Sequence, residues 1–272
     1  MEQIDRLLAQ GKTHEAADLI RKSVAEGRKL DGDPVRYANQ LVIDCDWETV
    51  AKLLPPEMNA LETSGWLHSL RTGRPVDRNG SALPWMNYAA IDFIGAKITA
   101  QTRVFEWGAG YSSLWFAARA MEVVCAEDNI EWNSALGKKL PANVRLMSLP
   151  GKADYVNCIT NEPGEFDVIV IDGSFRNDCA PMCDGKLAKN GFVIFDNSDS
   201  REFDQSMKYF GEQGYFRIDF WGLIPSYLYK NCTSIFFRDA DILKHSPPPS
   251  KMVPSTGISC FQAYFSRVAE DS

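Results

Sequence analysis

The sequence predicts an α/β protein with a doubly wound, mainly parallel sheet, an antiparallel edge strand and a helical extension at the N-terminus. Two apolar runs, VIVI at 168–171 and FVIF at 192–195, are bounded by polar turns, as is typical of strands buried on both faces. Helical and strand-like stretches alternate from residue 87 onward. This alternation favours parallel strands connected by helices.

The first part of the chain is expected to be helical. Apolar residues recur at helical spacing over residues 4–8 and again over 16–24, which predicts a helical hairpin. A further helix is expected over residues 35–54, before two prolines. Residues 72–84 are rich in Gly, Pro, Asn and Asp, which indicates a loop. We therefore predict two domains, a helical extension at 1–80 and an α/β domain at 81–272.

The second domain is expected to alternate helices and strands. Helices are predicted over residues 87–97, 112–121, 130–139 and 181–187, and strands over 103–106, 122–126, 144–147, 166–172 and 191–197. Two later stretches, 215–221 and 233–238, have the composition of strands. We expect these two to pair antiparallel at the edge of the sheet.

Composition and charge restrict the classes of function. The chain has 272 residues and a formal net charge of −7, and its basic residues are scattered, so neither nucleic acid nor an anionic membrane is an expected partner. The seven cysteines are odd in number and widely spread, which suits reduced thiols. The first residues lack the apolar segment of a signal peptide, and no apolar run is long enough to span a bilayer. We therefore expect a cytoplasmic protein.

The stretch VFEWGAGYSS, residues 104–113, predicts a ligand site at a strand-to-helix turn. Gly108 and Gly110 follow a strand that ends at Glu106, and glycines there leave backbone N–H groups open to a ligand. A dinucleotide turn would have Gly or Ala where Ser113 stands. A carboxylate before the glycines repels a pyrophosphate and attracts a cationic amine, such as that of S-adenosylmethionine. A tight turn without any ligand is the alternative.

A second acid strengthens this interpretation. Glu127 ends the next predicted strand, and in doubly wound nucleotide sites an acid about twenty residues after the turn binds the ribose hydroxyls. The alternative is that Glu127 only caps the helix that follows.

These residues resemble the class I S-adenosylmethionine-dependent methyltransferases. The resemblance covers residues 84–238 and rests on the glycine turn, CAED, FDVIVIDG and GFVIFDN. Within the class, the chain is similar to a bacterial subgroup with PW-x-x-Y before the first strand, an IDG-x-x-R-x-x-C stretch and a late CTSIFF strand. The resemblance implies a Rossmann-like methyltransferase sheet.

The resemblance also implies roles for single residues. Glu106, Gly108 and Gly110 would line the methionine end of the cofactor, and Glu127 would hold its ribose. Further cofactor contacts are expected from Ser112, Ser113, Trp85 and Tyr88. For the two aromatic residues, packing in the core is the alternative.

Three oxygen-bearing side chains close the fourth and fifth predicted strands. Asp172 ends one strand, and Asp196 with Asn197 ends the next. Such a set suits Mg²⁺, and it is similar to the metal triad of catechol-type O-methyltransferases, although Gly173 stands where those enzymes carry a bulky residue. Capping of the following turns is the alternative for both aspartates.

Catalysis without a metal is also open. Asp172 or Asp196 is then a candidate general base, and Arg176 is a candidate to bind a carboxylate or phosphate of the acceptor.

The sequence thus predicts methyl transfer from S-adenosylmethionine to a hydroxyl of a small molecule or sugar, with Mg²⁺ as a candidate cofactor. Two other classes remain open: an NAD-dependent oxidoreductase or epimerase, and a non-catalytic interaction protein that keeps the fold. The N-terminal helices are a candidate contact for a homodimer.

Overall fold

The computed structural model describes residues 2–28, 34–44, 60–136 and 140–244. These residues fall into two compact units. The first holds the described residues up to Gly80 together with Ile224–Tyr229, and the second holds Ser81–Leu223 and the residues from Lys230 to Lys244. None of the described helices combines the length and the apolar character needed to cross a lipid bilayer.

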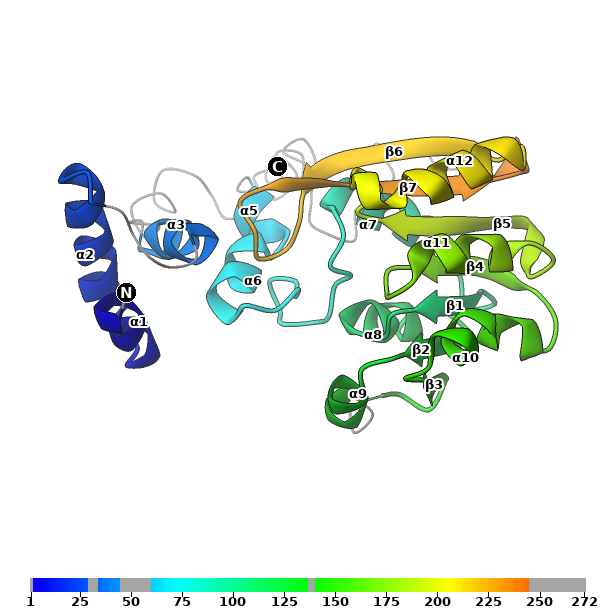
Figure 1. Ribbon diagram of the computed structural model, residues 1–272, viewed down its shortest axis with the longest axis horizontal. Coiled ribbons are helices and arrows are strands. Elements are labelled where there is room, and N and C mark those ends of the chain that lie inside the picture. Colours follow the sequence, from blue (N-terminus) through cyan, green and yellow to red (C-terminus); the bar gives the residue numbers. More distant parts are fainter. Residues whose placement is uncertain (1, 29–33, 45–59, 137–139, 245–272) are drawn as a thin grey trace, which may run out of the picture. The chain divides into compact units, whose positions relative to one another are not determined.

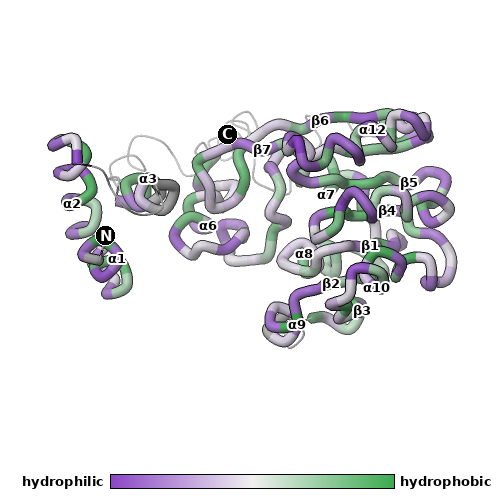
Figure 2. The backbone as a smooth tube through the Cα atoms, viewed as in Figure 1, coloured by the Kyte–Doolittle hydropathy of each residue, from purple (hydrophilic) through white to green (hydrophobic). Residues whose placement is uncertain are grey.

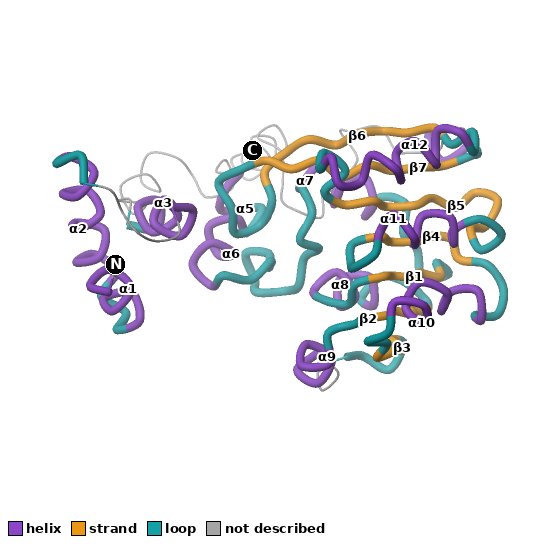
Figure 3. Tube along the Cα trace, in the orientation of Figure 1, coloured by secondary structure: helices purple, strands orange, loops and turns teal. Residues whose placement is uncertain are grey.

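The first unit is helical (Figure 3). The hairpin that the sequence predicts is α1 (Glu2–Ala9) and α2 (Thr13–Ala25), whose apolar faces pack together around Ile4 and Ile20. The helix predicted over 35–54 is α3 (Pro34–Ile43), and residues 45–54 lie outside the described part of the chain. Two short helices, α5 (Ala60–Thr63) and α6 (Trp66–Thr72), were not predicted.

One segment belongs to a different unit from the one that the sequence indicates. The predicted second domain includes residues 224–229, but Ile224–Tyr229 groups with the first unit. Hydrogen bonds to α6 are the reason. Trp66 Nε1 donates to the main-chain oxygen of Tyr227 at 3.0 Å, and Ser226 Oγ donates to the main-chain oxygen of Ser69 at 3.0 Å.

The second unit is a seven-stranded sheet in the order β3-β2-β1-β4-β5-β7-β6 (Figure 1). Its strands are β1 (Arg103–Trp107), β2 (Glu122–Glu127), β3 (Val144–Ser148), β4 (Phe166–Ile171), β5 (Leu187–Asp196), β6 (Phe216–Leu223) and β7 (Lys230–Phe237). The pairs among β1 to β5 are parallel, whereas β7 pairs antiparallel with both β5 and β6. The predicted fold class and the predicted antiparallel pair at the edge are confirmed.

Helices cover both faces of this sheet, and each face has its own core. Residues of α7 (Tyr88–Gly95) and α8 (Tyr111–Ala117) pack on one face. The other face is covered by α10 (Lys152–Asn157), α11 (Arg176–Cys179) and α12 (Asp204–Glu212). β4 is hydrophobic along most of its length (Figure 2), as expected for a strand covered on both sides.

The prediction of a helix over residues 181–187 is wrong. The chain instead forms α11, then a 3₁₀ turn at Ala180–Cys183, and Leu187 already begins β5. Gly185 has a φ of +75°, a conformation that suits glycine and reverses the chain toward β5. The helix predicted over 130–139 is α9 (Ile130–Leu136), and residues 137–139 lie outside the described part.

Candidate functional site

Three acidic residues lie on one face of the sheet where β1, β4 and β5 end. Glu106 is paired in register with Val170, and Val170 with Ile194. Because side chains alternate along a strand, Asp172 and Asp196, two residues further on, point to the same face as Glu106. This register is consistent with the prediction from the sequence that these strand ends bring oxygen-bearing side chains together.

Glu106 is fully buried, with 0% of its surface exposed. Ser113 Oγ donates to its Oε2, and no described residue donates to its Oε1. Burial raises the pKa of Glu106 to about 8, and the nearby charges of Asp172 and Glu127 add to this shift, while the nearby hydroxyls of Ser112 and Ser113 oppose it. A buried oxygen without a partner is costly, so this atom is a place where a donor from a ligand would stabilise the site.

The glycine turn lies directly beside this carboxylate. Gly108 has a φ of +98°, which strongly favours glycine. The amide of Gly110 donates to Ser113 Oγ at 3.0 Å, and α8 begins at the next residue. Ser113 therefore connects the turn with Glu106, and this is why the position carries a hydroxyl and not the small apolar residue of a dinucleotide turn.

Glu127, at the end of β2, holds the other side of the turn. Its Oε2 accepts the amide N–H of Ala109 at 3.1 Å, and its Oε1 accepts that of Asn129 at 2.8 Å. The side chain of Asn129 in turn accepts the amide N–H of Trp132 at 3.0 Å. Asn129 thus caps the start of α9, so capping of that helix does not by itself account for Glu127.

Trp132 is a neighbour of the turn that sequence reasoning missed. Its Nε1 donates to the main-chain oxygen of Ala109 at 2.6 Å, yet 41% of the residue is exposed. An exposed indole that is fixed by a hydrogen bond offers an aromatic face to a ligand. The available signal was an aromatic residue in the first turn of the helix after Glu127.

Asp196 is turned toward β7. Only 2% of the residue is exposed; Thr233 Oγ1 donates to its Oδ1 at 2.5 Å, and Asn231 Nδ2 lies 3.2 Å from the same oxygen. Burial raises the pKa of Asp196 to about 8, and the charge of Asp172 adds to the shift. Because its carboxylate is enclosed by β7, Asp196 is less accessible to an acceptor than Asp172.

Arg176 contacts the ends of both β4 and β5. Its Nε donates to Gly173 O at 2.9 Å, its Nη1 donates to Asp196 O at 2.6 Å and to Asn197 Oδ1 at 3.2 Å, and its Nη2 donates to Asp172 O at 2.9 Å. Nη2 also lies 3.1 Å from Asp172 Oδ1. The guanidinium thus makes four hydrogen bonds and one ion pair. Arg176 is therefore placed as a cross-link, and an acceptor anion would have to displace these bonds.

The three residues predicted to bind Mg²⁺ do not fit that role in this arrangement. Oδ1 of Asp172 and Oδ1 of Asn197 face the guanidinium of Arg176, and the Asp196 carboxylate faces Thr233 and Asn231. Within the described residues, no group of three or more His, Cys, Asp or Glu side chains is arranged to hold a metal ion; the predicted set has two such residues, with Asn197 as its third member. The guanidinium of Arg176 already contacts two of the oxygens that a divalent ion would need as ligands.

The two aromatic candidates lie near the start of α7. Trp85 is exposed, and Tyr88 is the first residue of α7 and packs partly against the core beneath that helix. Asn87 caps α7, because its side-chain oxygen accepts the amide N–H of Ala90 at 3.0 Å. The cofactor role of Trp85 and Tyr88 stays a prediction.

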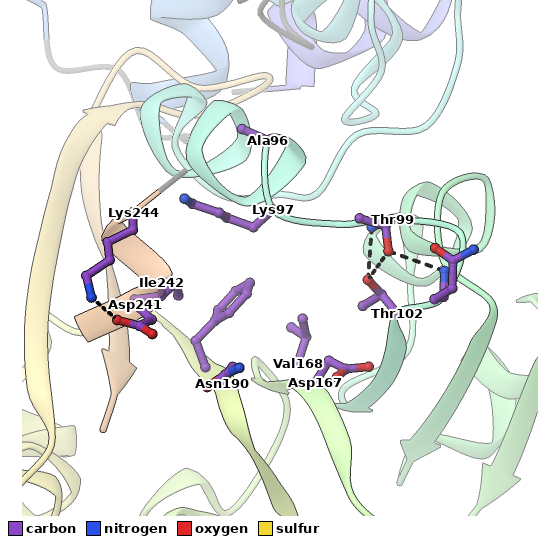
Figure 4. A pocket seen from close by; sticks show the side chains of 12 residues that line it. Ala96, Lys97, Thr99, Thr102, Asp167, Val168, Asn190, Asp241, Ile242 and Lys244 are labelled. Carbon is purple, nitrogen blue, oxygen red and sulfur yellow. Dashed lines mark hydrogen bonds and ion pairs between the residues drawn. The ribbon is translucent and has the colours of Figure 1, made fainter. Parts of the chain in front are cut away.

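A separate pocket of about 370 Å³ lies at the opposite edge of the sheet, where the strands begin. Figure 4 shows Lys97, just after the end of α7, Asp167 from β4 and Asn190 from β5 around it. The Lys244–Asp241 ion pair also lines it. Its lining is of mixed charge, and none of the predicted site residues belongs to it.

No protein-family model and no curated protein matches the chain. Solved structures are similar in fold. A putative O-methyltransferase from Klebsiella pneumoniae is 17% identical, with 71% of this chain and 96% of that chain covered and a TM-score of 0.43. A methyltransferase-like protein from Silicibacter pomeroyi is 18% identical, with 65% and 93% covered and a TM-score of 0.41. Spermidine synthase from Thermotoga maritima is 15% identical, with 62% and 65% covered and a TM-score of 0.47. The order of the seven strands, with β7 antiparallel, agrees with the sheet that the sequence resemblance implies.

Proposed function

We propose that this protein is an S-adenosylmethionine-dependent methyltransferase that acts on a hydroxyl of a small molecule or sugar. The observation that carries the proposal is Oε1 of Glu106, a buried oxygen with no hydrogen-bond donor among the described residues, at the end of β1 beside Gly108. The amine of S-adenosylmethionine would supply both the missing donor and a compensating positive charge. A pyrophosphate at the same place would face this acid, which argues against NAD.

The second acid supports the same ligand. Each oxygen of Glu127 accepts one backbone N–H, and a carboxylate oxygen has room for a second donor. Glu127 can therefore accept the hydroxyls of a ribose while it holds the turn. Trp132, fixed on Ala109, offers an aromatic face beside the same turn. We infer that Glu106 and Glu127 bind the two ends of one ligand.

The residues of the chain then have to position an acceptor. S-adenosylmethionine supplies a methyl group activated on a sulfonium, so the remaining requirement is mainly alignment. Asp172 Oδ1 lies 3.1 Å from Arg176 Nη2, which leaves Oδ2 to accept the hydroxyl proton of the acceptor. Burial raises the pKa of Asp172, although the charge of Arg176 opposes the shift, and a raised pKa suits a general base near neutral pH.

Titration calorimetry tests the cofactor half of the proposal. We expect heat of binding with S-adenosylmethionine and with S-adenosylhomocysteine, and none with NADH. Glu106→Gln should weaken binding of both, because glutamine cannot ionise to compensate the positive charge of the amine. The matched control is Glu131→Gln, an exposed acid in the first turn of α9. A folded protein that gives no heat with either methionine-derived ligand would rule out the proposed activity.

A further inference from the structure

Arg176 is held in place by more than its hydrogen bonds. Its Cζ lies 5.0 Å from the centre of the Phe203 ring, so the guanidinium stacks on an aromatic face. Its side chain is only 12% exposed. An arginine that is largely covered, stacked on a ring and held by four hydrogen bonds is a fixed charge of the site rather than a mobile arm.

The backbone around Arg176 is adapted to this placement. Phe175, the residue before it, has a φ of +54°, and Asn197, whose side chain accepts from Nη1, has a φ of +52°. A positive φ is uncommon for residues other than glycine, and more so for a bulky residue such as phenylalanine. Strained positions of this kind persist where the surrounding structure imposes them, and they gather at functional sites.

We propose that the guanidinium of Arg176 is the built-in cation of this site and takes the place of a divalent metal ion. The inference rests on the proposed methyltransferase function. Arg176 binds the oxygens of Asp172 and Asn197, two of the three side chains that a metal would need. It also binds the main-chain oxygen of Asp196, the third of these residues. Methyl transfer in this protein therefore proceeds without Mg²⁺.

A guanidinium in place of a metal ion changes which acceptors the site can take. A bound metal favours acceptors with two adjacent oxygens, because both can coordinate the ion. Here the group that faces the acceptor is one carboxylate, Asp172, whose second oxygen is oriented by the contact of the first with Arg176. The proton of the hydroxyl passes to Asp172 Oδ2 as the new carbon–oxygen bond forms and the carbon–sulfur bond of the donor breaks. An acceptor with a single hydroxyl is sufficient for this geometry.

Binding of Mn²⁺, a spectroscopic substitute for Mg²⁺, tests the assignment on the full chain. Electron paramagnetic resonance distinguishes free from protein-bound Mn²⁺, and it needs no knowledge of the acceptor. We expect the wild-type protein to leave the ion free, with and without S-adenosylmethionine. Arg176→Ala, confirmed as folded by circular dichroism, should gain a bound ion, and the added change Asp172→Asn should abolish that binding. Arg176→Lys is the control that keeps a positive charge and should not gain the ion.

Two results would overturn the proposal. One is that the wild-type protein binds Mn²⁺ and that Asp172→Asn abolishes this binding. This comparison does not depend on whether Arg176→Ala folds. The other is a folded Arg176→Ala that leaves the ion free. Failure of the methyltransferase proposal would look different, because calorimetry in EDTA would then show no binding of S-adenosylmethionine. Retention of that binding in EDTA together with free Mn²⁺ supports both proposals.

Discussion

The backbones of Gly108 and Gly173 pack directly against each other at the ends of β1 and β4. A Cβ on Gly108 would lie 2.7 Å from the amide nitrogen of Gly173, and a Cβ on Gly173 would lie 2.8 Å from the amide nitrogen of Gly108. A Cβ on Gly173 would also lie 2.0 Å from the hydroxyl of Tyr155. These contacts explain why glycine follows Asp172 here, at a position where the sequence resemblance implies a bulky residue.

The first prediction follows from this contact. Gly173→Ala should reduce the free energy of unfolding by about 3 kcal/mol, the upper part of the usual range for overpacking, because backbone atoms cannot move aside as a side chain can. Urea denaturation measures the change. The same variant should weaken the binding of S-adenosylmethionine, since the turn at Gly108 must shift.

A glycine elsewhere provides the matched control. Gly211 lies in α12, and a Cβ there would meet no heavy atom within 4 Å. Gly211→Ala should therefore stabilise the protein by up to about 1 kcal/mol through helix propensity. Equal effects of the two alanine substitutions would mean that Gly108 and Gly173 do not require their close approach.

The second prediction concerns pH and Glu106. Burial raises the pKa of this carboxyl from its ordinary value of 4.5 to about 8. Between these values the folded protein holds a proton on Glu106 that the unfolded chain has lost, so the free energy of unfolding falls as pH rises, by at most ~1.4 kcal/mol per unit. Glu106→Gln cannot titrate and should escape this loss.

The difference between the two proteins isolates this one group. Chemical denaturation at several pH values gives the free energy of unfolding of each protein. The value for Glu106→Gln minus that for the wild type should increase from pH 5 to pH 8 and stay constant above pH 8. Other buried acids, such as Asp196, titrate in both proteins and cancel in the difference. An advantage that does not vary with pH would show that Glu106 has an ordinary pKa.

The third prediction concerns Glu127. Glu127→Ala should weaken binding of S-adenosylmethionine by about 1–3 kcal/mol, or roughly 5- to 150-fold in Kd, because ligand hydroxyls lose their acceptor. It also frees the amide of Ala109, so the turn should become less ordered. Calorimetry gives the change in affinity, and Glu131→Ala is the control. An unchanged Kd would contradict the assignment of Glu127 to the ribose.

The sequence was sufficient to predict the sheet and the glycine turn because their signals are local. Apolar runs mark β4 and β5, and Glu106 stands two residues before Gly108. The strand ends could be expected to meet because parallel strands share one carboxyl edge. The helix α12, in contrast, was not predicted: its two buried residues are Ser206 and Phe210, and one of them is polar.

The partners of the acids could not be predicted, because they depend on contacts that are distant in sequence. Thr233 reaches Asp196 only because β7 enters the sheet antiparallel and pairs Asp196 with Thr233. Arg176 turns back toward Asp172 because of the positive φ of Phe175. Residue types alone do not determine the strand register or the φ angle of a residue. The sequence therefore did not show that the two aspartates have other partners than a metal ion.

The last prediction concerns the chain of hydrogen bonds that ends at Asp196. Asn87 Nδ2 donates to Phe220 O at 2.8 Å and to Thr233 Oγ1 at 3.0 Å, so both of its protons are used. Thr233 then has one proton, which it donates to Asp196 Oδ1 at 2.5 Å. The cap of α7 is thus connected to the carboxylate at the end of β5.

Thr233→Val keeps the shape of the side chain and removes its hydroxyl, which leaves a donor on Asn87 unpaired and leaves Asp196 Oδ1 with the weaker of its two donors, Asn231. The free energy of unfolding should fall by about 1–3 kcal/mol, whereas Thr233→Ser should lose much less. The hydrogen bond from Thr233 lowers the pKa of Asp196, which burial otherwise raises to about 8; it therefore stabilises the ionised form more than the protonated one. The loss in Thr233→Val should accordingly be larger at pH 9 than at pH 6, as measured by urea denaturation. Equal losses for valine and serine would mean that the methyl group of Thr233, and not its hydroxyl, holds Asp196 in place.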